Sequence, residues 1–319
     1  MPETVSLGNG KVSGAFGRNM RYRLKRLYKS RQLLVLFLPC FIYMILFRYA
    51  PMWGVLISFK DYKILKGFWD SKWIGFSNFI RFFENPMMPR LIMNTFLISL
   101  YSMLWGFPLP IILALYLNEL KGRRSKKFLQ TVTYLPYFLS TVVVVGMFIM
   151  FLSPRGFVSL AIQTMGFKPD VFFSDPRYFR SLFIVMGVWT GTGWSSIIYI
   201  AAISGIDTAL YEAASIDGAN KLQKILNITL PSIMPTIITL FLLNTGSLLS
   251  VGFEKIYLMQ NPANLAVSEV LATFVYKQGI QSNKMGYATA VDLFNSVVGL
   301  ALIVISNWFA KRVSDYSIW

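Results

Sequence analysis

The sequence has no histidine, a single cysteine and few acidic residues, and each scarcity excludes a kind of site. Without histidine the chain lacks the side chain that ordinarily titrates near neutral pH, and one thiol, Cys40, cannot close an internal disulfide. Metal sites built from Cys and His are excluded on the same grounds. No Gly-x-x-x-x-Gly-Lys-Ser/Thr motif occurs, so the sequence offers no phosphate-binding loop for ATP. No paired carboxylates or nucleophile–base arrangement stands out, which makes an enzyme the least supported class.

Charge is scarce, whereas apolar residues are abundant. Charged residues make up 14% of the 319 residues and apolar residues 55%, while soluble domains carry about 25% charged residues. Six apolar runs reach or approach the roughly 20 residues that cross about 30 Å of hydrocarbon. These runs are Leu33–Phe59, Leu91–Leu117, Phe128–Leu152, Ser181–Ser204, Ile233–Val251 and Met285–Ala310. The sequence therefore predicts an all-α integral membrane protein with six transmembrane helices.

The net charge of +17 comes largely from Lys and Arg in segments that flank the apolar runs. These residues are dense at Arg18–Arg31 and at 118–127, and such density is typical of the cytoplasmic side of a membrane. We therefore expect a multi-pass plasma-membrane protein with cytoplasmic N- and C-termini. Residues 1–31 would be a basic cytoplasmic segment lying against anionic lipid, followed by the six-span domain, residues 32–319. Nucleic-acid binding is the alternative explanation of the basic N-terminus, but orientation in the membrane explains the charge better, so we expect no nucleic-acid partner.

The stretch between the fourth and fifth runs is polar and contains two predicted helices. Asp207–Ile216 is rich in alanine, which favours helix. Lys221–Ile228 is predicted to end because Pro231 cannot continue the hydrogen-bond ladder. Gly218 between them permits a turn that a residue with a Cβ would resist. Glu212 beside small side chains would give a face that another protein can approach closely. The alternative is a connecting loop with two helical turns.

The spacing within this stretch resembles the EAA loop of ABC importer permeases. Glu212-Ala213-Ala214 is followed after three residues by Gly218, after nine more by Ile228, and then by Leu230-Pro231. From the second run onward, the organisation resembles the type I importer permease (MetI-like) fold. The resemblance implies that residues 205–235 form a cytoplasmic coupling loop that contacts an ATPase. The residues it assigns to ATPase coupling are Tyr211, Glu212, Ala213, Ala214, Asp217, Gly218, Ala219, Ile228, Leu230 and Pro231.

Four further stretches resemble the LplB-type permeases for complex oligosaccharides: Tyr49–Gly54, Ser58–Tyr62, Trp73–Phe79 and Tyr316–Trp319. This resemblance implies the transmembrane permease subunit of a bacterial ABC importer for oligosaccharides, a transport subunit and not an enzyme. The implied partners are a second related permease in a heterodimer, two copies of a cytoplasmic ABC ATPase and an extracellular solute-binding protein. ATP and Mg would be held by the ATPase, and this chain would bind no cofactor or metal of its own.

Polar and aromatic side chains inside the apolar runs predict a substrate path, because they are costly in hydrocarbon unless they face a cavity or a partner. Aromatic rings beside hydroxyl and amide groups suit a sugar, which has apolar C–H faces and many hydroxyls. Some of these residues recur at helical spacing, and Tyr137 and Thr141 are predicted to lie one turn apart on the third helix. The alternative is that these side chains hold the helices together. The candidate substrate residues are Asn244, Ser247, Phe253, Trp189, Trp194, Tyr137 and Thr141.

Two other transport functions stay open. An ABC permease for a non-sugar solute, such as a polyamine or phosphate, would need charged residues in the path, and the fourth and fifth runs contain almost none. An ion-coupled secondary transporter would need several ionisable residues within the spans. Asp292, in the sixth run, is the one clear candidate for such a residue.

Overall fold

The computed structural model describes residues 31–166, 168, 171–246, 248–249 and 251–313. The predicted basic segment apart from Arg31, the candidate Ser247 and the C-terminal stretch Tyr316–Trp319 lie outside the described residues. The chain divides into two compact units, Met1–Leu56 and Ile57–Trp319.

The described part of the first unit is helical throughout. Helix α2 (Arg31–Met44), the π-helical turn η1 (Ile45–Tyr49) and the 3₁₀ segment η2 (Ala50–Phe59) follow one another directly, and η2 runs on into the second unit. Most of the large apolar side chains of α2 are exposed, with Leu36 reaching 77%. A continuous apolar surface of this kind is what a lipid-facing helix presents, whereas soluble proteins rarely expose one.

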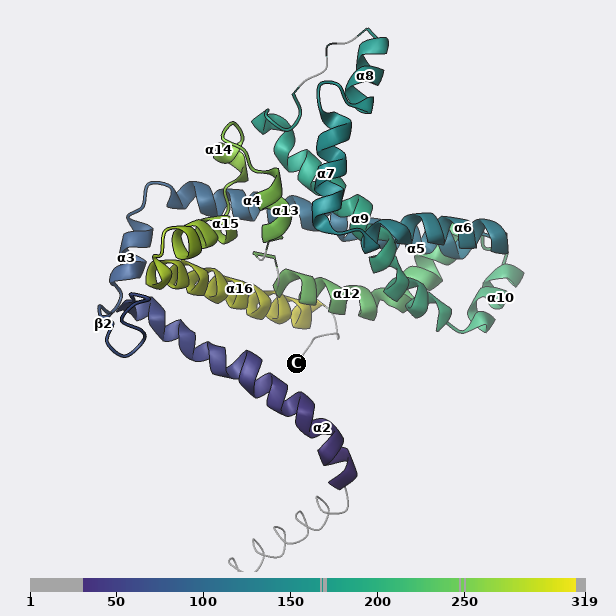
Figure 1. The fold of residues 1–319 in the computed structure, drawn as a ribbon. Coiled ribbons are helices and arrows are strands. Elements are labelled where there is room, and N and C mark those ends of the chain that lie inside the picture. Colours follow the sequence, from purple (N-terminus) through teal and green to yellow (C-terminus); the bar gives the residue numbers. More distant parts are fainter. Residues whose placement is uncertain (1–30, 167, 169–170, 247, 250, 314–319) are drawn as a thin grey trace, which may run out of the picture. The chain divides into compact units, whose positions relative to one another are not determined.

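The second unit is built from helices and one short antiparallel pair of strands (Figure 1). In that pair, β1 (Lys60–Asp61) and β2 (Lys72–Trp73) place Lys60 opposite Trp73. The α-helices are α3 (Ser77–Phe83), α4 (Met88–Gly106), α5 (Pro108–Glu119), α6 (Arg123–Tyr134), α7 (Thr141–Leu152), α8 (Phe157–Thr164), α9 (Pro176–Ser204), α10 (Thr208–Ile216), α11 (Lys221–Lys224), α12 (Leu230–Gly246), α13 (Phe253–Met259), α14 (Leu265–Ser268), α15 (Leu271–Tyr276) and α16 (Met285–Val313). Shorter 3₁₀ and π-helical segments are η3 (Leu135–Phe138), η4 (Ile225–Thr229) and η5 (Lys277–Gln281).

Within the described residues, six helical segments are long and apolar enough to cross a membrane, which confirms the predicted number. They are Leu34–Phe59, Met88–Glu119, Thr141–Thr164, Pro176–Ser204, Lys221–Gly246 and Met285–Arg312. The third differs from the prediction, because the chain leaves the helical conformation at Leu139 and restarts at Thr141. The hydroxyl of Ser140 caps the new helix by accepting a hydrogen bond from the amide of Val143 at 3.3 Å. Tyr137 and Thr141 therefore do not lie one turn apart on one helix, and that prediction is wrong.

The prediction that a helix ends before Pro231 is also wrong. Helix α11 continues through η4 into α12, and the amide of Leu230 bonds to the carbonyl of Ile225, five residues back. Proline has no N–H and crowds the carbonyl four residues before it, and a π-helical turn relieves both conflicts by widening the backbone. Pro231 is then tolerated as the second residue of α12. The second predicted helix and the fifth span are thus one continuous helical segment.

Residues 252–284, which lie between the fifth and sixth apolar runs of the sequence, fold against the rest of the unit through buried asparagines. The amide of Asn94 on α4 donates to the carbonyl of Ala266 at 3.0 Å. The amide of Asn264 donates to the carbonyl of Phe173, also at 3.0 Å. Buried backbone carbonyls require partners of this kind. These side chains therefore allow an irregular segment, with α13, α14 and α15, to stay packed on the helices.

Helix α9 organises the second unit, because it contacts α4, α5, α6 and α12. Asp175 is its N-cap. The Asp175 carboxylate accepts hydrogen bonds from the backbone amide of Arg177 at 2.8 Å and from the Arg177 guanidinium at 2.6 Å. The hydrogen bond from the Arg177 side chain lowers the pKa of Asp175. Further along, the buried Gly193 lets α6 approach closely, because a Cβ there would overlap the carbonyl oxygen of Thr133.

We expect Gly193→Ala to lower the melting temperature of the purified protein. Alanine is favoured in a helix by about 1 kcal/mol over glycine, but overlap with the α6 backbone forces a shift that costs about 1–3 kcal/mol. Gly191→Ala is the matched control on the same helix, since a Cβ there meets nothing within 4 Å. Thermal unfolding in detergent, followed by tryptophan fluorescence, measures both variants. Equal melting temperatures would contradict the close approach of α6 to α9.

Candidate functional site

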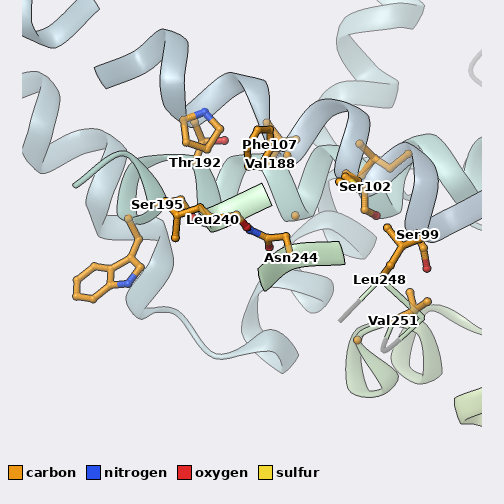
Figure 2. Close-up of a pocket in the computed structure, with 18 of the residues that line it drawn as sticks. Ser99, Ser102, Phe107, Val188, Thr192, Ser195, Leu240, Asn244, Leu248 and Val251 are labelled. Carbon is orange, nitrogen blue, oxygen red and sulfur yellow. The ribbon is translucent and has the colours of Figure 1, made fainter. Parts of the chain in front are cut away.

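A cavity of about 490 Å³ lies among α4, α5, α9, α12 and α13 (Figure 2). Its volume falls within the roughly 300–1,000 Å³ of small-ligand pockets. Gly187, Gly191 and Ser195 recur every four residues, so they share one face of α9, and their small size leaves the space open. The polar residues that line the cavity are Ser99, Ser102, Thr192, Ser195, Tyr199, Asn244 and Lys255.

Residues with hydroxyl and amide groups line the cavity. The Oγ of Ser102 on α4 and the Oγ1 of Thr192 on α9 are buried and have no hydrogen-bond partner among the described residues. A buried hydroxyl without a partner costs about 1–3 kcal/mol, so both oxygens favour a polar occupant. On α12, the amide nitrogen of Asn244 donates to the carbonyl of Leu240 at 2.8 Å. In the view of Figure 2, Asn244 lies between Thr192 on one side and Ser99 on the other.

Lys255 brings a positive charge to this lining from α13. Its ammonium donates a hydrogen bond to the carbonyl of Phe183 at 3.1 Å and lies 3.8 Å from the centre of the Phe183 ring. Gly187 makes room for it, because a Cβ at that position would come within 2.9 Å of the Lys255 Nζ. Burial lowers the pKa of Lys255 to about 8. The ammonium form therefore still predominates at pH 7.

The structure places the candidate substrate residues in different surroundings. Asn244 and Trp194 line the cavity. Tyr137 stacks on Trp194, with ring centres 4.5 Å apart and ring planes at 4° to each other. Tyr137 therefore packs against a residue that lines the cavity. Ser247 lies outside the described residues. The lining does not include Tyr137, Thr141 or Trp189, as far as the described residues show. Substrate binding by Asn244 and Trp194 stays a prediction.

The last candidate, Phe253, lines a second cavity of about 330 Å³ beside α15, η5 and α16. Its ring lies 5.4 Å from the ring of Tyr257 and 5.0 Å from that of Tyr276, measured between centres. Asp292, the acidic residue noted in the sixth run, also lines this second cavity. Because Lys255 and Phe253 line different cavities, α13 contributes to both.

The predicted coupling loop folds as two short helices joined by a tight turn. Asp207 is the N-cap of helix α10, and its carboxylate accepts a hydrogen bond from the backbone amide of Ala209 at 3.0 Å. Gly218 follows with a φ of +77°, in the left-handed region that a Cβ disfavours. Asn220 and Gln223 then cap α11 reciprocally, each side chain bonding the other's amide at 2.9 and 2.7 Å. The predicted first helix and the predicted glycine turn are confirmed.

Two hydrogen bonds hold α10 against the helical segment that follows it. The hydroxyl of Tyr211 lies 2.9 Å from that of Thr229 in η4, and the ammonium of Lys224 donates to the hydroxyl of Ser215 at 2.6 Å. Thr229 is only 2% exposed, and its helical segment runs on into α12. Direct contacts therefore join α10 to the helical segment that continues into α12.

The exposed surface of the loop includes two large apolar side chains beside charged and small residues. Ile216 is 87% exposed and Leu222 is 63% exposed, and Glu212 and Ala213 are exposed beside them. Exposed apolar groups gathered at one site mark a protein contact. Figure 1 shows α10 at one end of the second unit, away from α13, α14 and α15. Of the other predicted coupling residues, three are exposed, Asp217, Gly218 and Pro231, and five are partly buried, Tyr211, Ala214, Ala219, Ile228 and Leu230.

Sequence reasoning missed the α4 wall of the cavity and Lys255. Ser99 and Ser102 lie three residues apart within the second apolar run, a spacing that could have identified that wall. Lys255 had no such signal, because it lies outside the apolar runs, between the fifth and the sixth. Its place in the lining depends on the packing of α13 against α9.

Comparisons with known proteins agree with one another. Residues 106–315 match the family described as binding-protein-dependent transport system inner membrane component. Protein LplB of Bacillus subtilis (strain 168) is 42% identical over 287 residues, which cover 90% of each chain. The polygalacturonan/rhamnogalacturonan transport system permease protein YteP of the same organism is 39% identical over 306 residues, which cover 95% of each chain. A chain of the bacterial alginate ABC transporter, solved in complex with an alginate pentasaccharide-bound periplasmic protein, superposes with a TM-score of 0.85 at 37% identity, over 92% of this chain and 99% of that one.

These similarities confirm the predicted fold, a six-span ABC importer permease, and the resemblance to LplB-type permeases. They also confirm that the chain is a multi-pass membrane protein and a transport component, not an enzyme. The chain belongs to the family of binding-protein-dependent transport system inner membrane components.

Proposed function

We propose that the chain is the transmembrane permease subunit of an ATP-driven importer that carries oligosaccharides across a bacterial cell membrane. The observation that carries this proposal is the connection between the cavity and the coupling loop. Helices α9 and α12 both line the cavity, and α10 and α11 directly join them. A force applied to the loop therefore acts on two cavity walls.

The chemistry of the lining favours a sugar. Ser102, Thr192, Asn244 and Trp194 all line one space. Residues with hydroxyl, amide and aromatic groups match the hydroxyl groups and apolar C–H faces of a pyranose. YteP is named for the transport of polygalacturonan and rhamnogalacturonan, and the solved relative carries its alginate pentasaccharide on a periplasmic protein. Carbohydrate polymers are the substrates that these names share.

Other chains would supply the energy and the rest of the pathway. Because the sequence has no phosphate-binding loop, ATP and Mg would be held by two copies of a cytoplasmic ABC ATPase that dock on α10 and α11. A second related permease would complete the path as a heterodimer, and an extracellular solute-binding protein would deliver the sugar. Closure of the ATPase pair would shift α10, and the bond between Tyr211 and Thr229 would carry that shift to α12, changing the side from which the cavity is open.

The docking surface is tested by Ala213→Asp, which adds bulk and a negative charge to an exposed small residue. A clash in a packed interface costs ~2 kcal/mol or more, so association with the ATPase should fall over tenfold. Ser125→Asp is the control, because Ser125 is also exposed but lies at the start of α6, outside the coupling loop. Co-purification of the ATPase and uptake by reconstituted vesicles should fall together in Ala213→Asp alone. Normal association and uptake would show that the loop is only a connector.

The orientation is tested by single cysteines in a chain whose own Cys40 is replaced by alanine. Ser125 and Ser174 are both exposed, and the distribution of positive charge places the first inside the cell and the second outside. A membrane-impermeant maleimide added to intact cells should label a cysteine at 174 and leave one at 125 unlabelled until the membrane is opened. Labelling of both in intact cells would contradict the predicted topology.

The cavity is tested by Asn244→Leu, which removes an amide and keeps similar bulk. Loss of one hydrogen bond to the sugar corresponds to about 1 kcal/mol, or roughly a fivefold fall in uptake. Leu243→Ala is the control at the next position, where the side chain is 56% exposed and is not among the lining residues. Sugar uptake over a concentration series, with assembly checked by co-purification, distinguishes the two. Unchanged uptake by Asn244→Leu would favour a helix-packing role for this amide.

A further inference from the structure

The charge at Lys255 is unusual for its position. Among the described residues, none of the four ion pairs includes Lys255, and the described cavity lining contains no Asp or Glu. A buried charge is costly unless it is paired. Within the described part of the chain, the opposite charge that Lys255 calls for is missing.

The surroundings hold the ammonium in place without using all of its donors. An ammonium has three N–H donors, and the described residues give it one hydrogen-bond acceptor, the carbonyl of Phe183, together with the face of that ring. Gly187 leaves the space that the ammonium fills. If Lys255 served only to tie α13 to α9, a neutral side chain would make the same hydrogen bond without the cost of a buried charge.

Neutral donors accompany the ammonium in the same cavity. The Ser102 and Thr192 hydroxyls are buried and have no partner among the described residues, and both line the space that Lys255 lines. An ionised carboxylate is an acceptor with about four lone-pair sites and forms its strongest hydrogen bonds with charged donors. The lining thus combines a cationic donor with two hydroxyls that have no partner among the described residues, and its described residues include no acid. Such a lining suits a carboxylate.

We propose that this cavity takes oligosaccharides that contain uronic acids and that Lys255 pairs with a uronate carboxylate as the sugar passes. The inference rests on the proposed function, since it specifies the class of sugar that the same cavity carries.

The test uses the complete importer, with its partner permease, ATPase and binding protein, in sealed vesicles. The probe is a mixture of trimers to pentamers of galacturonate, mannuronate and guluronate, with neutral xylose, arabinose and mannose chains of the same lengths. Mass spectrometry identifies which sugars enter. The variants are Lys255→Met, which keeps the length and removes the charge, Lys255→Arg, which keeps the charge, and Lys284→Met, which removes an exposed lysine outside the described lining.

We expect the unaltered importer to take up uronate chains. Lys255→Met should lower that uptake about tenfold or more, the size of one lost charge-assisted hydrogen bond, while neutral chains are unaffected. Lys255→Arg should retain uronate uptake, and Lys284→Met should behave like the unaltered protein. Two results would contradict the proposed pairing of Lys255 with a uronate: uptake of neutral chains alone by the unaltered importer, or an equal loss of both classes of chain in Lys255→Met. Either result would still be consistent with a sugar importer. Uptake of no sugar by the unaltered importer would contradict the proposed function itself.

Discussion

The absence of water in the bilayer core is the constraint on which this structure depends. Backbone amides and carbonyls in hydrocarbon need partners within the protein, so the chain crosses as helices, and irregular backbone stays covered. Buried carbonyls between the spans are satisfied in the same way, by side chains. Asn94 on α4 donates to the carbonyl of Ala266 in residues 252–284, and Asn264 within that segment donates to the carbonyl of Phe173. Once covered in this way, α13 can lie against α9 and place Lys255 in the cavity.

Backbone hydrogen bonding also continues through the helical segment that connects the coupling loop to the cavity. The helical segment from α11 through η4 to α12 keeps its backbone bonded across Pro231 by means of one π-helical turn. Tyr211 and Thr229 join α10 to that segment at 2.9 Å. The exposed loop is therefore connected directly to two helices that line the cavity, by the continuous backbone and by this hydrogen bond.

The parts that sequence reasoning predicted are those that local pattern controls. Apolar runs are set by the thickness of the bilayer, and the turn at Gly218 is set by a positive φ that glycine adopts freely, so both were predictable. The parts missed depend on tertiary packing. Tolerance of Pro231 required a π-helical turn, and the place of Lys255 in the cavity lining required α13 to pack against α9. Asn244 was found because polar groups within a span are costly, a signal that needs no structure.

The central claim is that sugar passes through the cavity lined by α4, α9 and α12, and cross-linking tests it most directly. A photoreactive benzoylphenylalanine at Val188 would face the cavity, whereas one at Leu300 would sit on a surface that is 60% exposed and outside the described lining. In vesicles that are importing a radiolabelled oligosaccharide, illumination should label the chain through position 188 and only when ATP is present. Equal labelling at both positions, or none at 188 while import continues, would contradict the account.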